Sequence, residues 1–377
     1  MEKEVKYCKR CIYNTGIIPA LEFDESGICS YCQLHDQMDR DYPTGEEGWK
    51  ILTEIAEKVK KNGEGKKYDC VVGVSGGTDS SYMVYLLKEK LGLRPLAVHF
   101  DNTWNSKIAV ENIQKVLKKL DVDLYTYVID NEEFCDMSRS FLEAAVSETD
   151  CITDIALTTT LYLAADKYDV KYIFDGHNFR TEGTVPLDWS YFDGKYISSI
   201  HKRFGKKKMK TFPNLWLRNW FVYLFKKIKR IRPLNYLNLD KDETKEFLSK
   251  EFDWQWYGGH HLENRHTKFH HYLSITRFKK DKRYVELSAF VRSGKMTREK
   301  ALEEIKKPIE YPKDVVEEIK RRLGFTDEEY EEVLKRPIKS AKDYKTYHPT
   351  FKKLRPVFWA MYKAQLVPRT FYEKYTK

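Results

Sequence analysis

A short stretch between an apolar run and a helical pattern carries side chains suited to phosphate chemistry. It reads S-G-G-T-D-S and consists of Ser75, Gly76, Gly77, Thr78, Asp79 and Ser80. Amides of a glycine-rich turn and of a helix N-terminus attract phosphate oxygens, serine hydroxyls can donate to them, and Asp79 can approach Mg²⁺. The alternative is a tight turn in which Asp79 or Ser80 only caps the helix. The chain contains neither the Walker pattern G-x-x-x-x-G-K-S/T nor the dinucleotide pattern G-x-G-x-x-G. A different kind of phosphate loop is therefore predicted.

Four cysteines near the N-terminus form two C-x-x-C pairs, separated by residues 12–28; they are Cys8, Cys11, Cys29 and Cys32. This spacing is typical of a tetrahedral zinc site, and residues 12–28 are expected to form a short hairpin. Four cysteines leave no open coordination position, so the predicted role is structural. An iron–sulfur cluster is the alternative. The other three cysteines, Cys70, Cys135 and Cys151, are expected to be small buried residues.

The positions of these motifs depend on the elements around them. Strands are expected at residues 71–74, 94–100, 124–129 and 170–176, and helices at 46–61, 105–120 and 132–168. Apolar strands that alternate with helices predict an α/β fold with a doubly wound parallel sheet, covered on both faces. Ligands of such sheets bind beyond the carboxyl ends of the strands. Residues 75–80, 99–104 and 175–178 should therefore meet at one edge.

Composition sets broad limits on the class of protein. The chain has 377 residues, 41% of them hydrophobic, and a net charge of +10, which favours phosphates, nucleotides, nucleic acid or a membrane surface as partners. The sequence shows neither a signal-peptide pattern nor an apolar run long enough to span a bilayer. A cytoplasmic location is expected. In that compartment, seven cysteines indicate metal binding or chemistry rather than disulfides.

The S-G-G-T-D-S stretch resembles the signature of the PP-loop ATP pyrophosphatases. These proteins have an adenine nucleotide alpha hydrolase-like fold and cleave ATP to AMP and pyrophosphate while adenylating an acceptor oxygen. Further blocks resemble the bacterial N-acetyl sugar amidotransferases of the legionaminic, pseudaminic and mannuronic acid type. These blocks are DNTWNSKIAVENIQKVLKKLDVDLYTYVID, TDIALTTTLYLAADKYDVKYIFDGHNFRTEGTVP, YISSIHKRFG, YGGHHLENRHTKF and DKRYVELSAFVRSGKMTREKALEEI. The resemblance covers roughly residues 5–335, including the four-cysteine motif.

The resemblance implies a reaction and a division into parts. The acetamido oxygen of an N-acetylated, nucleotide-activated sugar would be adenylated and replaced by ammonia, for lipopolysaccharide, other surface polysaccharide or flagellin glycan biosynthesis. It also implies ATP, Mg²⁺ and Zn²⁺ as cofactors. The chain lacks G-x-C-x-G, so ammonia would come from a separate glutaminase subunit through a cyclase-like barrel subunit. The expected parts are a zinc knuckle (1–40), a PP-loop domain (41–205), a mostly helical substrate or partner domain (206–340) and a basic aromatic tail (341–377).

Roles for individual residues follow from the same resemblance. The six loop residues would hold the β- and γ-phosphates with magnesium, and Asp79 is also a catalytic candidate. The adenosine would lie between the ends of two strands. One end consists of His99, Phe100 and Asp101, and the other of Gly176 and His177. The candidates for the sugar pocket are Asn102, Trp104, Asn178, Arg180, Thr181 and Glu182. For Trp104, stacking on a sugar ring and packing under a loop are equal alternatives.

Residues 257–283 contain five histidines: His260, His261, His266, His270 and His271. A metal site is one interpretation, but a segment that folds over the nucleotide is favoured. His261, Glu263 and Lys268 match the family pattern and are catalytic candidates together with Arg283. Lys268, Arg277, Lys282 and Arg283 could neutralise phosphate charge. The alternative is a solvated basic face.

Residues 206–233 mix aromatic and basic residues at helical spacing. A docked helix that covers the sheet or a partner is favoured over a membrane-surface helix or a nucleic-acid patch. The sequence predicts no function for the tail after residue 340.

Two other classes of function compete with the amidotransferase. A PP-loop tRNA-modifying enzyme, of thiolase or lysidine synthetase type, would suit the positive charge. Thiolases often need paired cysteines near ATP, for which only Cys135 and Cys151 are available. A nucleotide-binding regulatory module without catalysis is the third class. Nucleic acid is disfavoured as a partner because the family blocks indicate a sugar substrate, and peripheral contact with a membrane stays an alternative that no family block supports.

Overall fold

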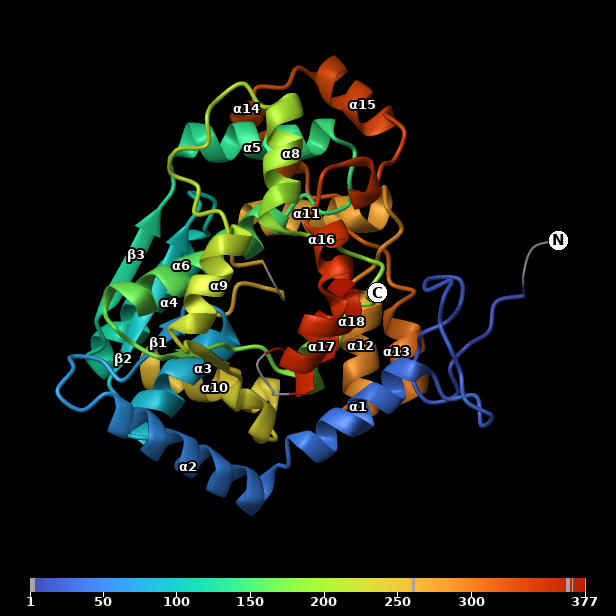
Figure 1. Ribbon diagram of the computed structural model, residues 1–377. Helices are drawn as coiled ribbons and strands as arrows, with labels where there is room; N and C mark the ends of the chain where they lie inside the picture. The colour runs from blue at the N-terminus through green and yellow to red at the C-terminus, as the bar shows by residue number, and fades with distance from the viewer. Residues whose placement is uncertain (1–3, 260–261, 364–366, 368, 377) are drawn as a thin grey trace.

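The computed structural model describes residues 4–259, 262–363, 367 and 369–376. Its centre is a five-stranded parallel sheet in the order β3-β2-β1-β4-β5 (Figure 1). The strands are β1 (Cys70–Gly73), β2 (Pro95–Asp101), β3 (Leu124–Val128), β4 (Tyr172–Phe174) and β5 (Lys229–Ile231). The predicted α/β fold is confirmed. The sequence did not indicate β5, because its basic residues lack the apolar run that marks the other strands.

The two faces of the sheet are covered by different helices. Val71 and Val72 are adjacent on β1, so their side chains point to opposite faces. Val71 packs in a cluster with Leu161 and Ala164 of α6, whereas Val72 packs with side chains of α2, α3, α4 and α10. The sheet is therefore doubly wound, as predicted.

The remaining elements complete the chain in order. In the first half, the helices are α1 (Ser30–Asp41), α2 (Gly45–Asn62), α3 (Thr78–Tyr85) continued by the π-helical turn η1 (Leu86–Lys90), α4 (Lys107–Leu120), α5 (Asn131–Glu143), α6 (Cys151–Lys167), α7 (Phe179–Glu182) and α8 (Gly194–Phe204). In the second half, they are α9 (Leu217–Phe225), η2 (Pro233–Tyr236), α10 (Lys241–Phe252), α11 (Arg265–Thr276), α12 (Arg283–Arg292), α13 (Arg298–Glu304), α14 (Lys313–Leu323), α15 (Asp327–Lys335), η3 (Ala341–Asp343), α16 (His348–Lys353), α17 (Arg355–Lys363) and α18 (Arg369–Thr376).

The helix predicted over residues 132–168 is two helices. α5 ends at Glu143, Ala145 has a left-handed φ of +56°, and α6 begins at Cys151. A left-handed residue ends a right-handed helix, although the apolar pattern runs on across the break. As a result, α6 lies on the sheet while α5 packs in a separate core with α8, α11 and α14.

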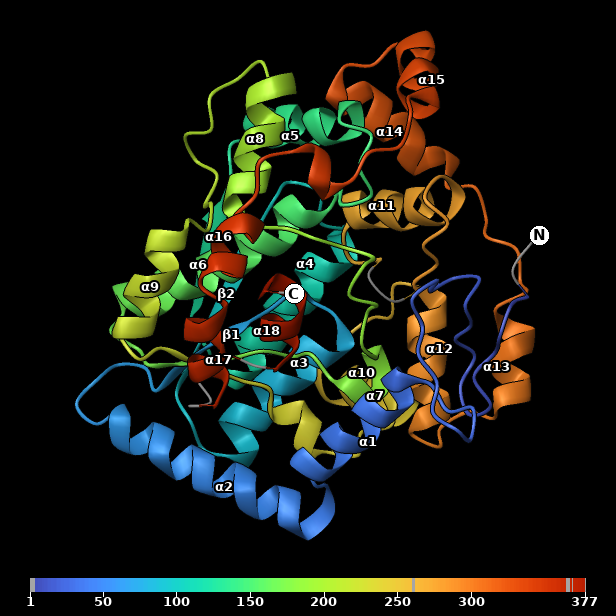
Figure 2. The ribbon, with the colours of Figure 1, turned by 45° about the vertical axis from the view of Figure 1, so that its right-hand side comes forward.

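Two segments without an assigned function pack against each other. Leu217, Trp220 and Leu224 of α9 contact the apolar cluster formed by α16, α17 and α18, and the Trp220 ring stacks on Phe371 with centroids 5.7 Å apart. Figures 1 and 2 both show α17 and α18 between α9 and α12. Part of residues 206–233 is therefore a docked helix, as favoured from the sequence, and its partner is the chain's own tail.

None of the helices in the described ranges combines the length and the apolar character needed to cross a lipid bilayer.

Candidate active site at the carboxyl edge of the sheet

The predicted phosphate loop joins β1, which ends at Gly73, to α3, which begins at Thr78. β1 has β2 on one side and β4 on the other, so the loop leaves the sheet at its topological switch point. The Ser75 and Ser80 hydroxyl oxygens lie 3.2 Å apart, and the Gly77 amide donates to Ser75 Oγ across 3.3 Å. The loop thus presents hydroxyls and amides together at the helix N-terminus, where an anion is favoured.

The two adjacent glycines are required for different reasons. Gly76 has a φ of +80°, and a Cβ there would lie 2.2 Å from the carbonyl oxygen of Ala109 on α4. Gly77 has ordinary backbone angles, but its Cβ would lie 3.1 Å from the Tyr257 hydroxyl oxygen and 3.8 Å from Oε1 of Glu263. Gly76 therefore allows α4 to pack, whereas Gly77 allows the C-terminal part of the chain to approach the loop.

Asp79 lies among ionisable groups from other elements. Lys241 Nζ, at the start of α10, is 2.9 Å from Asp79 Oδ2. Burial raises the pKa of Asp79; Lys241 opposes the increase and Glu182 of α7 adds to it. Burial lowers the pKa of Lys241, but Asp79 and Glu182 outweigh this effect and raise it overall. The oxygens of the two carboxylates are of the kind that Mg²⁺ prefers, and Lys241 places a cation beside them.

The two strand ends expected to flank adenosine lie beside the loop. A Cβ at Gly176 would be 3.7 Å from the Ser80 amide nitrogen, and Nδ1 of His177 contacts Glu182 Oε2. On the other side, His99 Nδ1 is 2.9 Å from the carbonyl oxygen of Val74. The structure therefore brings both predicted strand ends to the loop, with His99 in contact with its backbone.

Phe100 and Asp101, both predicted to flank adenosine, make contacts within the protein. Phe100 is buried in the core shared with α5 and α11. The Asp101 carboxylate accepts hydrogen bonds from the Thr103 amide (2.7 Å) and from Asn105 Nδ2 (3.0 Å). Asp101 therefore supports the turn after β2, and Phe100 is enclosed in the core.

The structure does not support most of the predicted sugar pocket. Asn102 and Trp104 are each 1% exposed, and the Arg322 guanidinium carbon lies 3.6 Å from the centroid of the Trp104 ring. The indole therefore packs under the loop and offers no open face for stacking. Asn102 accepts a hydrogen bond from Asn264 Nδ2 (2.8 Å), which ties the turn after β2 to α11.

The residues predicted after β4 have the same structural character, with one exception. Asn178 caps α7, Thr181 is fully buried, and Arg180 reaches away from the loop to Asp39 (2.7 Å) and the Tyr42 carbonyl (2.8 Å). Arg180 thus joins α7 to the N-terminal region. Of the six sugar-pocket candidates, Glu182 is the one beside Asp79 in the described structure.

The segment before α11 folds over the phosphate loop, as expected. Trp254 Nε1 donates to the Gly76 carbonyl across 3.0 Å, and Asn112 of α4 exchanges hydrogen bonds of 2.8 Å with the backbone of Gln255. Tyr257 and Glu263 lie over Gly77. Burial raises the pKa of Tyr257, and Glu263 adds to the increase. His260 and His261, the latter a catalytic candidate, lie outside the described residues.

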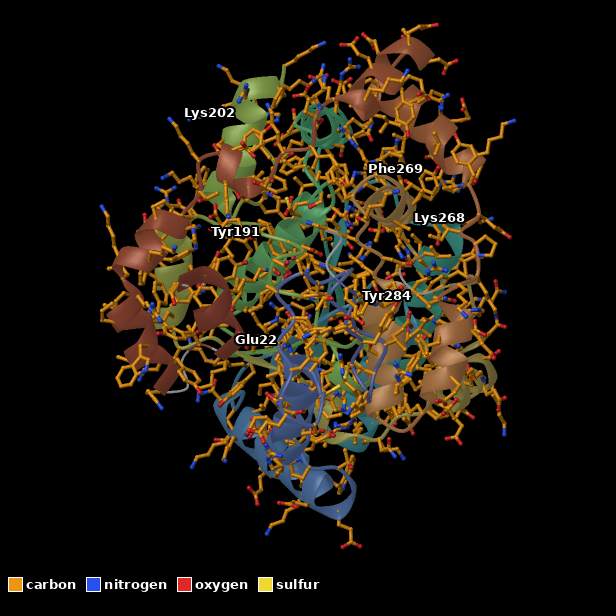
Figure 3. All side chains as sticks on the ribbon, turned by 90° about the vertical axis from the view of Figure 1, so that its right-hand side faces the viewer. Glu22, Tyr191, Lys202, Lys268, Phe269 and Tyr284 are labelled. Atoms are coloured by element: carbon orange, nitrogen blue, oxygen red, sulfur yellow. The ribbon has the colours of Figure 1, made fainter. Side chains whose placement is uncertain are left out.

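Two other catalytic candidates in this block lie elsewhere. Lys268, on α11 in Figure 3, adds to the positive field that lowers the pKa of Asp314 on α14. Arg283 pairs with Asp281 (2.7 Å) and donates to the Lys307 carbonyl after α13 (2.8 Å). Arg277 donates to the Arg336 carbonyl (2.9 Å). Arg277 and Arg283 therefore join packed helices, and among the described residues none of the three cations has a printed contact with the phosphate loop.

The two histidines that stand four residues apart belong to a buried hydrogen-bond network. His266 Nδ1 is 3.0 Å from Asp150 Oδ1, and His270 Nδ1 is 2.7 Å from Thr149 Oγ1. The described residues contain a single group of side chains that could hold a metal ion, and it consists of the four cysteines. The histidine metal-site alternative therefore finds no support in the described part of the chain.

The four N-terminal cysteines converge as predicted. Their Sγ atoms all lie within 4.8 Å of one another, with separations of 3.8 Å (Cys8 to Cys32), 3.7 Å (Cys11 to Cys29) and 3.6 Å (Cys29 to Cys32). Zinc–sulfur bonds of about 2.3 Å at tetrahedral angles place sulfurs about 3.8 Å apart. The spacing fits one tetrahedral ion, whereas a four-iron cluster would spread the sulfurs further because each binds a different iron.

The cysteine group is joined to the rest of the chain through α12. Arg292 is 5% exposed and donates to Cys32 Sγ (3.4 Å) and Cys11 Sγ (3.2 Å). Tyr284, at the other end of α12, packs against the same N-terminal cluster (Figure 3). Because α12 also packs on α7, the cysteine site supports the helix that carries Glu182.

Cys135 and Cys151 do not form a reactive pair. Both are buried in the hydrophobic core, and burial raises the pKa of each thiol. A raised pKa disfavours the thiolate that thiolase chemistry needs.

The contacts of Lys241, Trp254 and Tyr257 with the phosphate loop were not predicted from the sequence. Asp240 is a good N-cap residue and marks the start of α10. Nothing in the local sequence shows that this start faces Asp79, which is 162 residues away. Tyr257 is the first residue of a block that resembles the family, but it had no stated role; Trp254 precedes that block and had no signal in the sequence.

Two segments that contribute residues to the site match different family models. Residues 49–158 match the NAD synthase family model, and residues 251–357 match the model described as "LPS biosynthesis protein WbpG-like, C-terminal domain". An uncharacterized protein of Methanocaldococcus jannaschii, MJ1599, is 27% identical over 315 residues, which cover 84% of this chain and 98% of that protein.

Solved structures with related folds are more distant. An NH3-dependent NAD synthetase from Campylobacter jejuni is 14% identical and covers 73% of this chain and 93% of its own, with a TM-score of 0.33. The U34-tRNA thiolase NcsA from Methanococcus maripaludis, with its 4Fe-4S cluster, is 15% identical and covers 81% and 90%, with a TM-score of 0.34. Both TM-scores are low.

The parallel sheet, the S-G-G-T-D-S loop at its switch point and the NAD synthase match together show a PP-loop, NAD synthase-like fold. Residues 251–357 are similar to the C-terminal domain of WbpG-like LPS biosynthesis proteins, and the first residues of this region close over the loop. The family resemblance inferred from the sequence is thereby confirmed at the level of a PP-loop fold followed by a WbpG-like C-terminal region.

Proposed function

We propose that this protein is an ATP-dependent amidotransferase that converts the acetamido group of an N-acetylated sugar into an acetamidino group. A single observation carries the proposal: the WbpG-like domain packs directly on the PP-loop, with Trp254 bonded to Gly76 and Tyr257 and Glu263 over Gly77. The domain that resembles lipopolysaccharide biosynthesis proteins therefore borders the place where a PP-loop protein holds ATP.

The chemistry requires activation of an amide oxygen, which is a poor leaving group. The oxygen attacks the α-phosphorus of ATP, the α–β phosphate bond breaks and pyrophosphate leaves. Ammonia then attacks the activated carbon, and AMP departs with the former amide oxygen. The chain's own contribution is positioning and charge stabilisation. The loop would hold the phosphates, Asp79 and Glu182 would hold Mg²⁺, and Lys241 would offset the charge that develops on pyrophosphate.

Zinc would be held by Cys8, Cys11, Cys29 and Cys32 and would stabilise the N-terminal fold. A separate glutaminase and a barrel-shaped subunit that conducts ammonia remain part of the proposal, because the sequence contains no glutaminase nucleophile motif. We place the reaction in the synthesis of a bacterial surface glycan within the cytoplasm.

An isotope experiment tests the reaction. The protein is incubated with ATP, an ammonium salt and UDP-N-acetylglucosamine that carries heavy oxygen in the acetamido group. Amidination predicts a sugar that is one mass unit lighter than unlabelled substrate, together with AMP that carries the heavy oxygen. AMP formed only when bulk tRNA is added would instead indicate a tRNA-modifying enzyme, and ATP binding without AMP would indicate a regulatory module.

A further inference from the structure

Helix α9 and the C-terminal helices form one docked unit, and this unit also has an outward face. Leu217, Trp220 and Leu224 of α9 pack into the apolar cluster of the tail, where the centroids of the Trp220 and Phe358 rings lie 5.9 Å apart. Figure 2 shows α9, α16 and α17 together along one side of the molecule. Each of these helices buries one face inside the unit, so its opposite face is turned to the surroundings.

The outward face of α9 combines apolar and basic side chains. Arg218, Val222 and Phe225 are all exposed, and their spacing of i, i+4 and i+7 places them on one side of the helix. Phe225 is 81% exposed, the highest value among the exposed large hydrophobic residues of the described structure. Lys226 and Lys227 follow directly and are exposed as well. An apolar centre is therefore flanked by cations at both ends.

Helix α17 repeats this arrangement. Arg355, Trp359 and Lys363 are exposed at positions i, i+4 and i+8, which again share one side of a helix. Trp359 is 51% exposed, and Lys363 Nζ lies 5.7 Å from the centroid of its six-membered or indole ring system. Val357 adds a further exposed apolar side chain. Two neighbouring helices of one unit thus each present apolar side chains between cations.

The positive charge of the chain is concentrated in the segments that supply this unit. Residues 206–233 contain ten lysines and arginines and no acidic residue, and residues 341–377 contain nine with two acidic residues. Together they carry a net charge of +17, whereas the whole chain carries +10, so the remaining residues are net negative. This distribution directs an anionic partner to the docked unit and away from the rest of the molecule.

We propose that the outward faces of α9 and α17 bind the surface of a lipid bilayer that contains anionic lipids. Val222, Phe225 and Trp359 enter the boundary between headgroups and acyl chains, while the flanking lysines and arginines contact headgroup phosphates. A nucleic acid also offers phosphates, and its bases stack on aromatic rings, but it provides no apolar medium for the exposed valines. The aliphatic side chains therefore favour the bilayer. This peripheral contact needs no spanning helix and is independent of the proposed reaction.

The test is cosedimentation of the full chain with vesicles, without nucleotide or sugar. The vesicles consist of phosphatidylcholine alone, or of phosphatidylcholine and phosphatidylglycerol in equal parts. The protein should partition onto the anionic vesicles, less so at high salt, and only weakly onto the neutral ones. Phe225→Gln and Trp359→Gln should each weaken partition onto anionic vesicles by about tenfold, because an apolar side chain no longer leaves water. Arg218→Gln and Lys363→Gln should each weaken it by about fivefold.

Trp49→Gln and Lys50→Gln are matched controls, because both side chains are exposed on α2, outside the docked unit. Both should bind anionic vesicles like the wild type, and thermal unfolding checks that every variant is folded. The proposal would be overturned if wild type did not bind anionic vesicles, or if Phe225→Gln and Trp359→Gln bound them as tightly as wild type.

Two further measurements identify other occupants of this face. Binding of bulk tRNA that Phe225→Gln and Lys363→Gln weaken, without binding to vesicles, would overturn the proposal in favour of a nucleic-acid surface. A wild-type dimer that Phe225→Gln converts to a monomer, measured by light scattering in the absence of lipid, would overturn it in favour of a second copy of the chain.

Discussion

Lys241 and Asp79 form an ion pair of 2.9 Å that joins the start of α10 to the first turn of α3. Both side chains are mostly buried, at 19% and 17% exposure. A buried pair of this kind is costly to desolvate and is weak evidence for stability by itself. Under the proposed function, this pair beside the phosphate loop would separate when ATP binds, with Asp79 turning to Mg²⁺ and Lys241 to the phosphates.

Lys241→Ala is expected to lower the rate of AMP formation by about 10²- to 10³-fold, because it removes a cation placed where charge develops during α–β bond cleavage. Lys241→Arg should recover part of the rate. The measurement is AMP release at saturating ATP, ammonium and acceptor. Lys250→Ala, at an exposed position on the same helix, is the control and should remain near the wild-type rate. A Lys241→Ala rate close to that of the control would show that the ion pair is only structural.

Trp254→Phe is expected to loosen the closure of the WbpG-like segment over the loop. The substitution removes the donor to the Gly76 carbonyl, which leaves that oxygen with the longer bond from Asn112 (3.3 Å). The loss should cost about 1 kcal/mol of unfolding free energy, and the KM for ATP should rise several-fold. Trp256, two residues away and 43% exposed, provides the matched variant. If Trp256→Phe raised the KM for ATP as much as Trp254→Phe, the bond to Gly76 would not be the cause.

The sheet and the phosphate loop could be predicted because local pattern encodes them. Val71 and Val72 lie in an apolar run, and the S-G-G-T-D-S turn follows at once. Long-range partners are not encoded in that way. Trp104 and Arg180 have the types and positions of ligand-binding residues, yet Arg322 covers the first and Asp39 pairs with the second. Which face a loop turns to the core depends on packing that the local sequence does not specify.

Arg292→Met is expected to weaken metal binding at the four-cysteine site by about ten- to a hundred-fold, because Cys11 and Cys32 lose their buried hydrogen-bond donor and the compensating positive charge. The measurement is competition for zinc with a chromophoric chelator. Arg40→Met, at an exposed position on α1, should bind zinc like the wild type. Unchanged zinc affinity in Arg292→Met would show that Arg292 does not stabilise the metal-bound thiolates. Since α12 packs on α7, removal of the metal should also raise the KM for ATP.

His270 should make the protein less stable in acid. Burial, with Lys282 and two neighbouring histidines, lowers the pKa of His270 to about 3, although Asp150 acts in the opposite direction. The unfolded chain binds this proton below about pH 6.5, whereas the folded chain does not until about pH 3, so the free energy of unfolding falls as pH decreases through that window. The contribution is on the order of 5 kcal/mol at most. His270→Gln removes this contribution. The free energy of unfolding, measured with urea between pH 7 and pH 4.5, should therefore decrease less in the variant than in wild type.

The variant should still lose some stability as the pH falls, because burial also lowers the pKa values of His35 and His271 to about 4. Identical slopes in the two proteins would show that His270 does not stay neutral in the folded state.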